Sequence, residues 1–183
     1  MKLVFQKDAL LNGISIVSKA IPAKTTMTIL ECILINADAN DIKLTGNDME
    51  LGIETKVEGS ILERGKIALE AKLFYEIVRK PPDGNSPVTI TSDNRFNTSI
   101  ECENASFHIQ GRDGDEFSYL PYIERDQHIS LTQFTLKESI RQTIFSISPN
   151  DSNKMMAGEL MEVKDDVFKV VSLDGHRISI RNI

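Results

Sequence analysis

The chain has 183 residues, 40% of them apolar and 26% charged, which is enough for one large domain or for one and a half ordinary ones. No apolar run reaches the roughly 18 residues of a membrane span, and the first eight residues do not form a secretion signal. The formal net charge of −6, from 21 Lys and Arg against 27 Asp and Glu, disfavours a free-standing DNA-binding domain that works by bulk charge.

Short strands separated by turn residues fill most of the first 110 positions. The predicted strands are 2–6, 30–37, 41–45, 51–57, 66–70, 87–91, 97–102 and 106–110. Two helices interrupt them. The first is capped by Asp8 and places Leu11, Ile14 and Val17 on one face, and the second covers Ala71–Arg79. Many strands with two inserted helices predict an α+β fold.

A second set of elements follows Pro121. The pattern predicts a strand at 129–134 and then a helix at 135–148, whose apolar face carries Ile140, Ile144 and Ile147. A hairpin of 160–163 with 167–171 and a final strand at 178–183 complete the chain.

The second set repeats the first in the same order. Shifted by 130 residues, Leu10, Ile14, Val17 and Ser18 fall on Ile140, Ile144, Ile147 and Ser148. Shifted by 126, the segment 41–48 falls on 167–174, with an Asp at the end of both. This order indicates an internal duplication. We therefore expect a first domain at 1–125 and a truncated second domain at 126–183, in a natural protein that continues further.

Charge is unevenly distributed along the chain. The helical stretches with their exit turns, 7–24, 70–80 and 135–148, carry eight basic and four acidic side chains, so the strands and loops carry the acidic excess. One explanation is that lysines favour helices. The other is a helical surface that faces a polyanion.

The tetrapeptide Asp174-Gly175-His176-Arg177 has two interpretations. Asp174 and His176 could act as an acid–base pair on a small substrate, but Asp-Gly is first a turn signal and no nucleophile motif accompanies it. A binding rim is the other interpretation. The isolated His108 and His128 predict no metal site. Cys32 and Cys102 have no metal spacing and indicate inert core thiols in a reducing, cytoplasmic compartment. We predict no cofactor.

Several motifs in order resemble the N-terminal half of the bacterial DNA polymerase III beta sliding clamp family. They are Leu44-Thr45-Gly46-Asn47-Asp48, Ala71-Lys72-Leu73-Phe74, Glu116-Phe117 with Leu120-Pro121, and Asp174-Gly175-His176-Arg177. The resemblance implies a DNA-clamp fold of repeated domains, each with two helices backed by antiparallel sheets. It implies three such domains per chain and a head-to-tail ring dimer around duplex DNA. The chain would hold domain one and the first part of domain two, with domain three absent.

The resemblance also implies where the chain binds. Lys24 matches a DNA-contacting loop residue, and the charge count adds Lys19, Lys72, Arg79, Lys137 and Arg141. A pocket for short peptide tails of the polymerase III catalytic subunit and of clamp-loader subunits would lie between domains two and three. This chain would supply Met156, Leu173, Gly175, His176, Arg177 and Ile178 to it. The family often has Leu at the position of Met156 and a small hydroxyl residue at that of Leu173, so the peptide preference could differ.

A third site implied by the resemblance is the ring interface. Ile77, Phe107 and Ile109 match its apolar part, whereas Asn104 and Ser106 stand where the family has arginines. Because domain three is missing, we expect no ring from this chain alone. The implied function is a non-catalytic processivity factor that tethers a polymerase to DNA. The alternatives are the small-molecule enzyme already described and a free-standing protein-interaction module.

Overall fold

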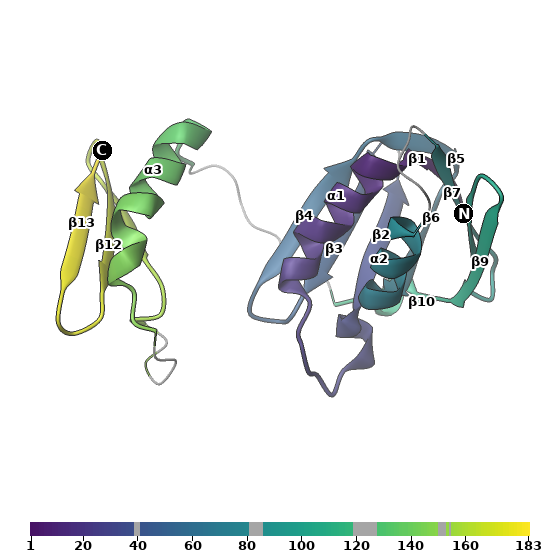
Figure 1. Cartoon of the computed structure of the whole chain (residues 1–183), viewed down its shortest axis with the longest axis horizontal. Helices are drawn as coiled ribbons and strands as arrows, with labels where there is room; N and C mark the ends of the chain where they lie inside the picture. The colour runs from purple at the N-terminus through teal and green to yellow at the C-terminus, as the bar shows by residue number, and fades with distance from the viewer. Residues whose placement is uncertain (39–40, 81–85, 119–127, 150–152, 154) are drawn as a thin grey trace. The chain divides into compact units, whose positions relative to one another are not determined.

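The computed structural model describes residues 1–38, 41–80, 86–118, 128–149, 153 and 155–183. The chain divides into two compact units, Met1–Tyr122 and Ile123–Ile183 (Figure 1). We call them unit 1 and unit 2 and describe each by itself.

Unit 1 is built on two antiparallel sheets of five strands each. The strand orders are β5-β1-β7-β8-β9 and β10-β6-β2-β3-β4. The first sheet contains β1 (Lys2–Gln6), β5 (Gly59–Glu63), β7 (Pro87–Ser92), β8 (Asn97–Cys102) and β9 (Ala105–Gln110). The second contains β2 (Cys32–Asp38), β3 (Asp41–Asn47), β4 (Gly52–Val57), β6 (Gly65–Glu70) and β10 (Arg112–Asp113). Three short 3₁₀ turns, η1 (Ser18–Ala20), η2 (Thr28–Glu31) and η3 (Gly114–Glu116), connect these elements.

Two helices lie side by side over the second sheet (Figure 1). Helix α1 (Lys7–Val17) contacts β3 and β4, and α2 (Ala71–Arg79) contacts β6. The helical period places Leu10, Ile14 and Val17 on the buried face of α1, and Phe74 and Val78 on that of α2. Burial of each of these side chains stabilises the fold by about 1.5–3 kcal/mol, so the apolar faces hold both helices on the sheet.

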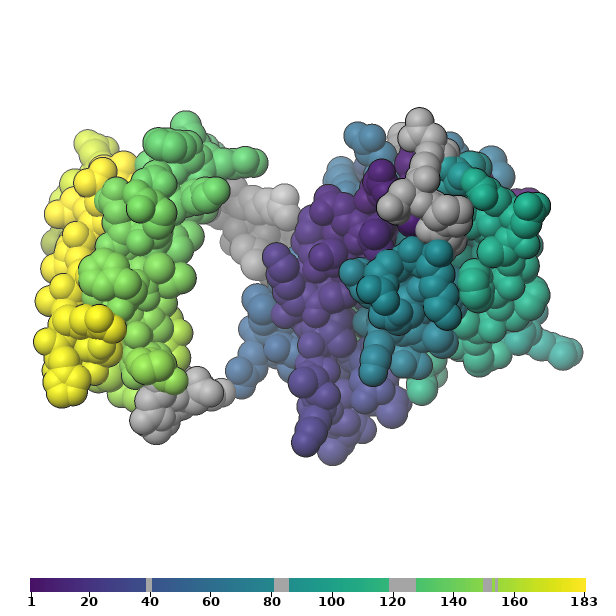
Figure 2. All heavy atoms as spheres, in the orientation of Figure 1, coloured from purple at the N-terminus to yellow at the C-terminus, as the bar shows by residue number. Residues whose placement is uncertain are grey.

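The same core contains the inward side chains of both sheets. Alternate positions along the strands point inward, as the two-residue period of a strand requires. The inward set includes Leu3, Phe5, Ile33, Ile35, Leu44, Ile67, Leu69, Val88, Ile90 and Ile100. In the space-filling view, α1 and α2 form the surface of unit 1 on the side that faces the viewer (Figure 2).

Unit 2 contains one helix against a three-stranded antiparallel sheet of order β11-β12-β13. The strands are β11 (Leu160–Lys164), β12 (Val167–Leu173) and β13 (Ile178–Asn182). Helix α3 (Gln133–Thr143), continued by the 3₁₀ turn η4 (Ile144–Ser146), packs against β12 and β13.

Two sequence predictions about α3 are wrong. Residues 129–134 do not form a strand, because the Thr132 Oγ1 accepts a hydrogen bond from the Thr135 backbone N–H at 3.0 Å and so caps a helix that begins at Gln133. The buried face is also polar, since Ser139, Thr143 and Ser146 are buried while Ile144 is 51% exposed. The helix ends at Thr143, and the tighter turn after it shifts the spacing on which the apolar face was predicted.

In unit 1, the start of α1 and the presence of β5 differ from the prediction. Helix α1 begins at Lys7, directly after β1, so Asp8 lies in the first turn instead of capping it, where its negative charge still favours the helix dipole. Strand β5 is not among the predicted strands. A Cβ on Gly59 would lie 2.8 Å from the Phe5 ring, so this glycine lets β5 approach β1. Helix α2 has the predicted bounds.

The turns after β3 and β12, which the predicted duplication aligns, have the same local geometry. The Asp48 carboxylate accepts hydrogen bonds from the backbone N–H groups of Glu50 and Leu51 at 2.9 and 2.6 Å. The Asp174 carboxylate accepts them from the residues two and three positions ahead, His176 and Arg177, at 3.0 and 3.1 Å. Both turns therefore use the same Asx geometry at positions 126 residues apart.

Candidate nucleic-acid interface and peptide groove

All six basic residues predicted to contact DNA are exposed. They fall into two sets on separate units. Unit 1 carries Lys19, Lys24, Lys72 and Arg79 on or beside its helices, and unit 2 carries Lys137 and Arg141 on α3. Lys72 and Arg79 on α2, and Lys137 and Arg141 on α3, have positions that follow from the helical period. Lys19 lies in η1, and Lys24 lies in the segment that follows it.

The six residues differ in their partners. The Arg79 guanidinium lies 2.8 Å from the Glu76 carboxylate and over the Tyr75 ring at 5.8 Å from its centroid. Arg141 forms two hydrogen bonds with Glu138, at 2.7 and 3.0 Å. Lys19, Lys24 and Lys72 form no ion pair with another described residue. Because exposed ion pairs are weak, all six remain available to a polyanion, the three lysines most directly.

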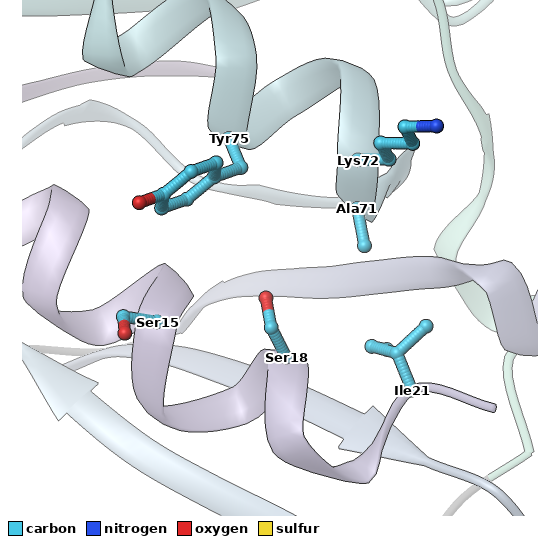
Figure 3. Close-up of a pocket in the computed structure, with 6 residues that line it drawn as sticks. All are labelled: Ser15, Ser18, Ile21, Ala71, Lys72 and Tyr75. Carbon is cyan, nitrogen blue, oxygen red and sulfur yellow. The ribbon is translucent and has the colours of Figure 1, made fainter. Parts of the chain in front are cut away.

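A groove separates α1 from α2 in unit 1 (Figure 3). Its volume is about 370 Å³, and its lining residues are Ser15, Ser18, Ile21, Ala71, Lys72 and Tyr75. Of these six residues, only Lys72 is among the site residues predicted from the sequence. Ser15 and Tyr75 belong to no recognised sequence motif. The three-residue spacing between Lys72 and Tyr75 does indicate that these two residues lie on the same side of α2.

A second groove lies in unit 2, with a volume of about 560 Å³. It contains two of the six residues predicted for the peptide pocket, Met156 and Leu173, together with Leu160, Val171 and Met155. Gly175, His176, Arg177 and Ile178 do not line it but follow Leu173 directly in the turn and in β13. Leu160 and Val171 were not predicted as pocket residues from the sequence. They reach the groove because β11 and β12 pair these two residues directly.

The turn beside this groove is fixed by Asp174. Besides the two backbone bonds already described, its carboxylate accepts a hydrogen bond from the Arg177 Nε at 2.9 Å. The backbone amide of His176, with the amide and guanidinium of Arg177, holds the pKa of Asp174 below its ordinary value. Arg177 also lies over the Phe145 ring, 5.9 Å from its centroid. The His176 side chain is exposed, so the geometry is that of a rigid rim and gives no support to an acid–base pair.

The residues predicted for a ring interface lie on two elements. Phe107 and Ile109 are half-buried against the core on β9, which is an edge strand of its sheet. Ile77 belongs to α2 and is only 5% exposed, so almost none of its side chain is open to a partner. Ser106 is exposed on β9, and Asn104 is exposed just before this strand.

Neither metal ligation nor reactive thiols can be assigned to the part of the chain that the structure describes. No group of three or more His, Cys, Asp or Glu side chains converges there. Cys32 and Cys102 are buried, and burial raises the pKa of both thiols, which keeps them protonated at neutral pH. Across the described residues, no helix has the length and apolar character needed to cross a membrane.

Comparison with known families assigns the chain in two parts. Residues 1–121 match the N-terminal domain of the DNA polymerase III beta subunit, and residues 130–183 match its central domain. The chain therefore belongs to the DNA polymerase III beta subunit family.

Curated relatives carry the name beta sliding clamp. The protein from Halalkalibacterium halodurans is 34% identical over 191 residues, which cover 100% of this chain and 50% of that protein. The Bacillus subtilis protein is 34% identical over 189 residues, covering 99% of this chain and 50% of the relative. The chain thus spans about half the length of the curated relatives it matches.

Solved structures give the same family and confirm the predicted clamp fold. A putative DNA polymerase III beta subunit from Eubacterium rectale is 63% identical with a TM-score of 0.91, and the match covers 100% of this chain and 50% of that chain. The sliding clamp of Bacillus subtilis is 32% identical with a TM-score of 0.91, at the same coverage.

Proposed function

We propose that this chain forms part of a sliding clamp that encircles duplex DNA and tethers a polymerase to it, as a non-catalytic subunit in the cytoplasm. The observation that carries the proposal is the family match over both units, together with exposed lysines beside the helices of an acidic protein. The relatives are about twice as long, so ring closure as a homodimer would require the length that they have.

A ring holds DNA by topology, and its individual contacts can therefore stay weak. Phosphate contacts from lysines are independent of sequence, which allows sliding. The acidic remainder of the molecule would repel nonspecific association with DNA outside the ring. Lys24, Lys19 and Lys72 are the first candidates for these contacts, followed by Arg79, Lys137 and Arg141.

The groove of unit 2 is our proposed site for short peptide tails of polymerase and clamp-loader subunits. Leu160, Val171, Leu173 and the two methionines offer an apolar floor for a Leu or Phe anchor. The turn 174–177 would form its polar rim. We propose the exposed edge of β9, with Phe107 and Ile109, as the ring interface; Ile77 would contribute through the packing of the core behind it.

Charge reversal tests the DNA interface in the protein of full natural length. The triple variant Lys19→Glu, Lys24→Glu and Lys72→Glu should bind a short linear duplex, on which enclosure gives no lasting retention, much more weakly at low salt, because an attractive phosphate contact becomes repulsive at each position. The matched control is Lys2→Glu, Arg64→Glu and Lys164→Glu, which changes the net charge equally at exposed positions outside the helices. Equal binding of both variants to the linear duplex would contradict the proposed DNA interface.

A further inference from the structure

Unit 1 consists of two halves with the same order of elements, apart from the edge strands β5 and β10. Each half has a leading strand, a helix and a meander of three strands. These are β1, α1 and β2-β3-β4 in the first half, and β6, α2 and β7-β8-β9 in the second. The leading strands are exchanged, because β1 pairs with β7 and β6 pairs with β2. Each half therefore supplies a strand to the sheet of the other.

Unit 2 matches one such half. Helix α3 contacts the second and third strands of the meander β11-β12-β13, just as α1 contacts β3 and β4 (Figure 1). Residues 128–132 directly precede α3, at the place where β1 precedes α1 and β6 precedes α2, but they form no strand. We call them the leading segment. Among the described residues β11 pairs only with β12, so its other edge is open to a further strand.

The open edge of unit 2 is apolar on the side that carries α3. Ser172 donates a hydrogen bond to the end of α3, and Val170 and Phe168 share its face of β12 by alternation. Met161 and Val163 of β11 pair with these two residues and so lie on the same face. Both are about half exposed, whereas Val170 and Phe168 are buried. In unit 1, α2 of the other half covers the corresponding edge, where it contacts β6.

The exchanged strands of unit 1 follow one rule of register. In both halves, the residue two positions before the helix pairs with the second residue of the first meander strand. Phe5 pairs with Val88 in this way. Leu69 pairs with Ile33. The residues four positions before each helix likewise pair with the fourth residue of that strand, and all these side chains are buried in the core.

The same rule gives apolar pairs in unit 2. It places Leu131 opposite Met161 of β11. It places Ile129 opposite Val163. All four side chains are exposed in the single chain, so both pairs would bury apolar surface. Residues 128–183 carry seven basic and seven acidic side chains, so net charge does not oppose the association of two copies of unit 2.

We propose that two copies of the 183-residue chain pair through unit 2. Each copy adds its leading segment as an antiparallel strand to the β11 edge of the other, and its α3 covers Met161 and Val163 there. The pairing has two-fold symmetry, so every contact occurs twice. It repeats between two chains the exchange that unit 1 makes within one chain. The inference does not depend on the proposed clamp function, and it uses a surface other than β9.

Sedimentation equilibrium of the 183-residue chain over a wide range of concentration measures the pairing. We expect a mass that rises to twice the 20.5 kDa of one chain and no further, because the two-fold pair fills both edges. Met161→Lys and Leu131→Lys should each weaken the pairing more than about tenfold, since an unpaired charge would be buried twice. The matched control is Ile180→Lys, an exposed residue on the opposite face of the sheet, which should leave the pairing unchanged.

Paired cysteines test the register. A chain with Leu131→Cys and Met161→Cys should form a covalent dimer on oxidation, because directly opposed residues of antiparallel strands are close enough for a disulfide. Leu131→Cys with Ile180→Cys is the matched control and should not. The native Cys32 and Cys102 are buried and stay out of the reaction.

Three results would overturn the proposal. The first is a mass of one chain at every concentration. The second is a dimer that withstands both Met161→Lys and Leu131→Lys, because the copies would then meet at another surface. The third is a disulfide that forms within one chain of the Leu131→Cys and Met161→Cys variant in place of a covalent dimer.

Discussion

At the scale of one residue, Gly46 near the end of β3 occupies a position that has no room for a side chain. A Cβ at this position would collide with the Val17 carbonyl oxygen, a backbone atom at the end of α1, and would lie 3.2 Å from the Ile21 Cδ1. The backbone of β3 therefore approaches the helix end more closely than any other residue allows. The predicted strand 41–45 ends before Gly46, whereas β3 includes this residue and brings it against the end of α1.

Gly46→Ala should lower the free energy of unfolding of unit 1 by about 1–3 kcal/mol, because the helix end must move to relieve the collision. Urea denaturation measures this as a lower midpoint with an unchanged slope. Gly158→Ala is the matched control, since nothing lies within 4 Å of its added Cβ, and it should stay within about 0.5 kcal/mol of the unaltered chain. Equal effects of the two substitutions would contradict the close approach at Gly46.

At the scale of one element, hydrogen bonds of hydroxyl groups attach α3 and the turn after it to the sheet of unit 2. Ser146 and Ser179 share a hydrogen bond of 2.6 Å, and the Ser172 hydroxyl donates to the Thr143 carbonyl oxygen. The Thr143 hydroxyl contacts the Glu159 carboxylate at 2.6 Å, which ties the helix to the groove of unit 2. The helix is thus held by satisfied polar pairs where an apolar face was expected.

Removing one partner of such a pair should cost more than removing both. Ser146→Ala leaves the Ser179 hydroxyl without its partner and should destabilise unit 2 by about 1–2 kcal/mol, as should Ser179→Ala. The double variant should cost less than the sum of the two, with a coupling of about 1 kcal/mol. The rate of amide hydrogen exchange in β12 and β13 measures the free energy of unfolding of unit 2 in each variant. Strictly additive costs would show that the two hydroxyls do not interact.

The contrast between α2 and α3 explains how far the elements could be predicted. Four of the nine α2 residues are buried and apolar, and two prolines follow the helix closely in sequence, so both pattern and stop signal were clear. The buried positions of α3 are serine and threonine, which no hydrophobic period can reveal. For the proposed DNA interface, the charge count indicated Lys19 and Lys72, whereas Lys24 came from the family resemblance. Ser15, Tyr75, Leu160 and Val171 could not be predicted, because they come to line a groove only when distant segments pack together.

At the scale of the whole molecule, the distribution of charge follows the repeated arrangement of the elements. Each unit places a helix bearing exposed basic residues against an antiparallel sheet, and both repeat the Asx turn of Asp48 and Asp174. In the proposed clamp, basic helices on an acidic protein would favour DNA contacts at the helices and disfavour them elsewhere. A ring of such units would need only weak contacts, because enclosure prevents dissociation.

The most direct test of enclosure compares circular and linear DNA. The protein of full natural length is loaded onto a nicked circular duplex, and its retention is measured before and after one restriction cut. We predict stable retention on the circle and rapid loss after the cut, as the ring slides from the free ends. Equal retention on circular and cut DNA would show that the protein holds DNA by direct binding, and would contradict the sliding-clamp function.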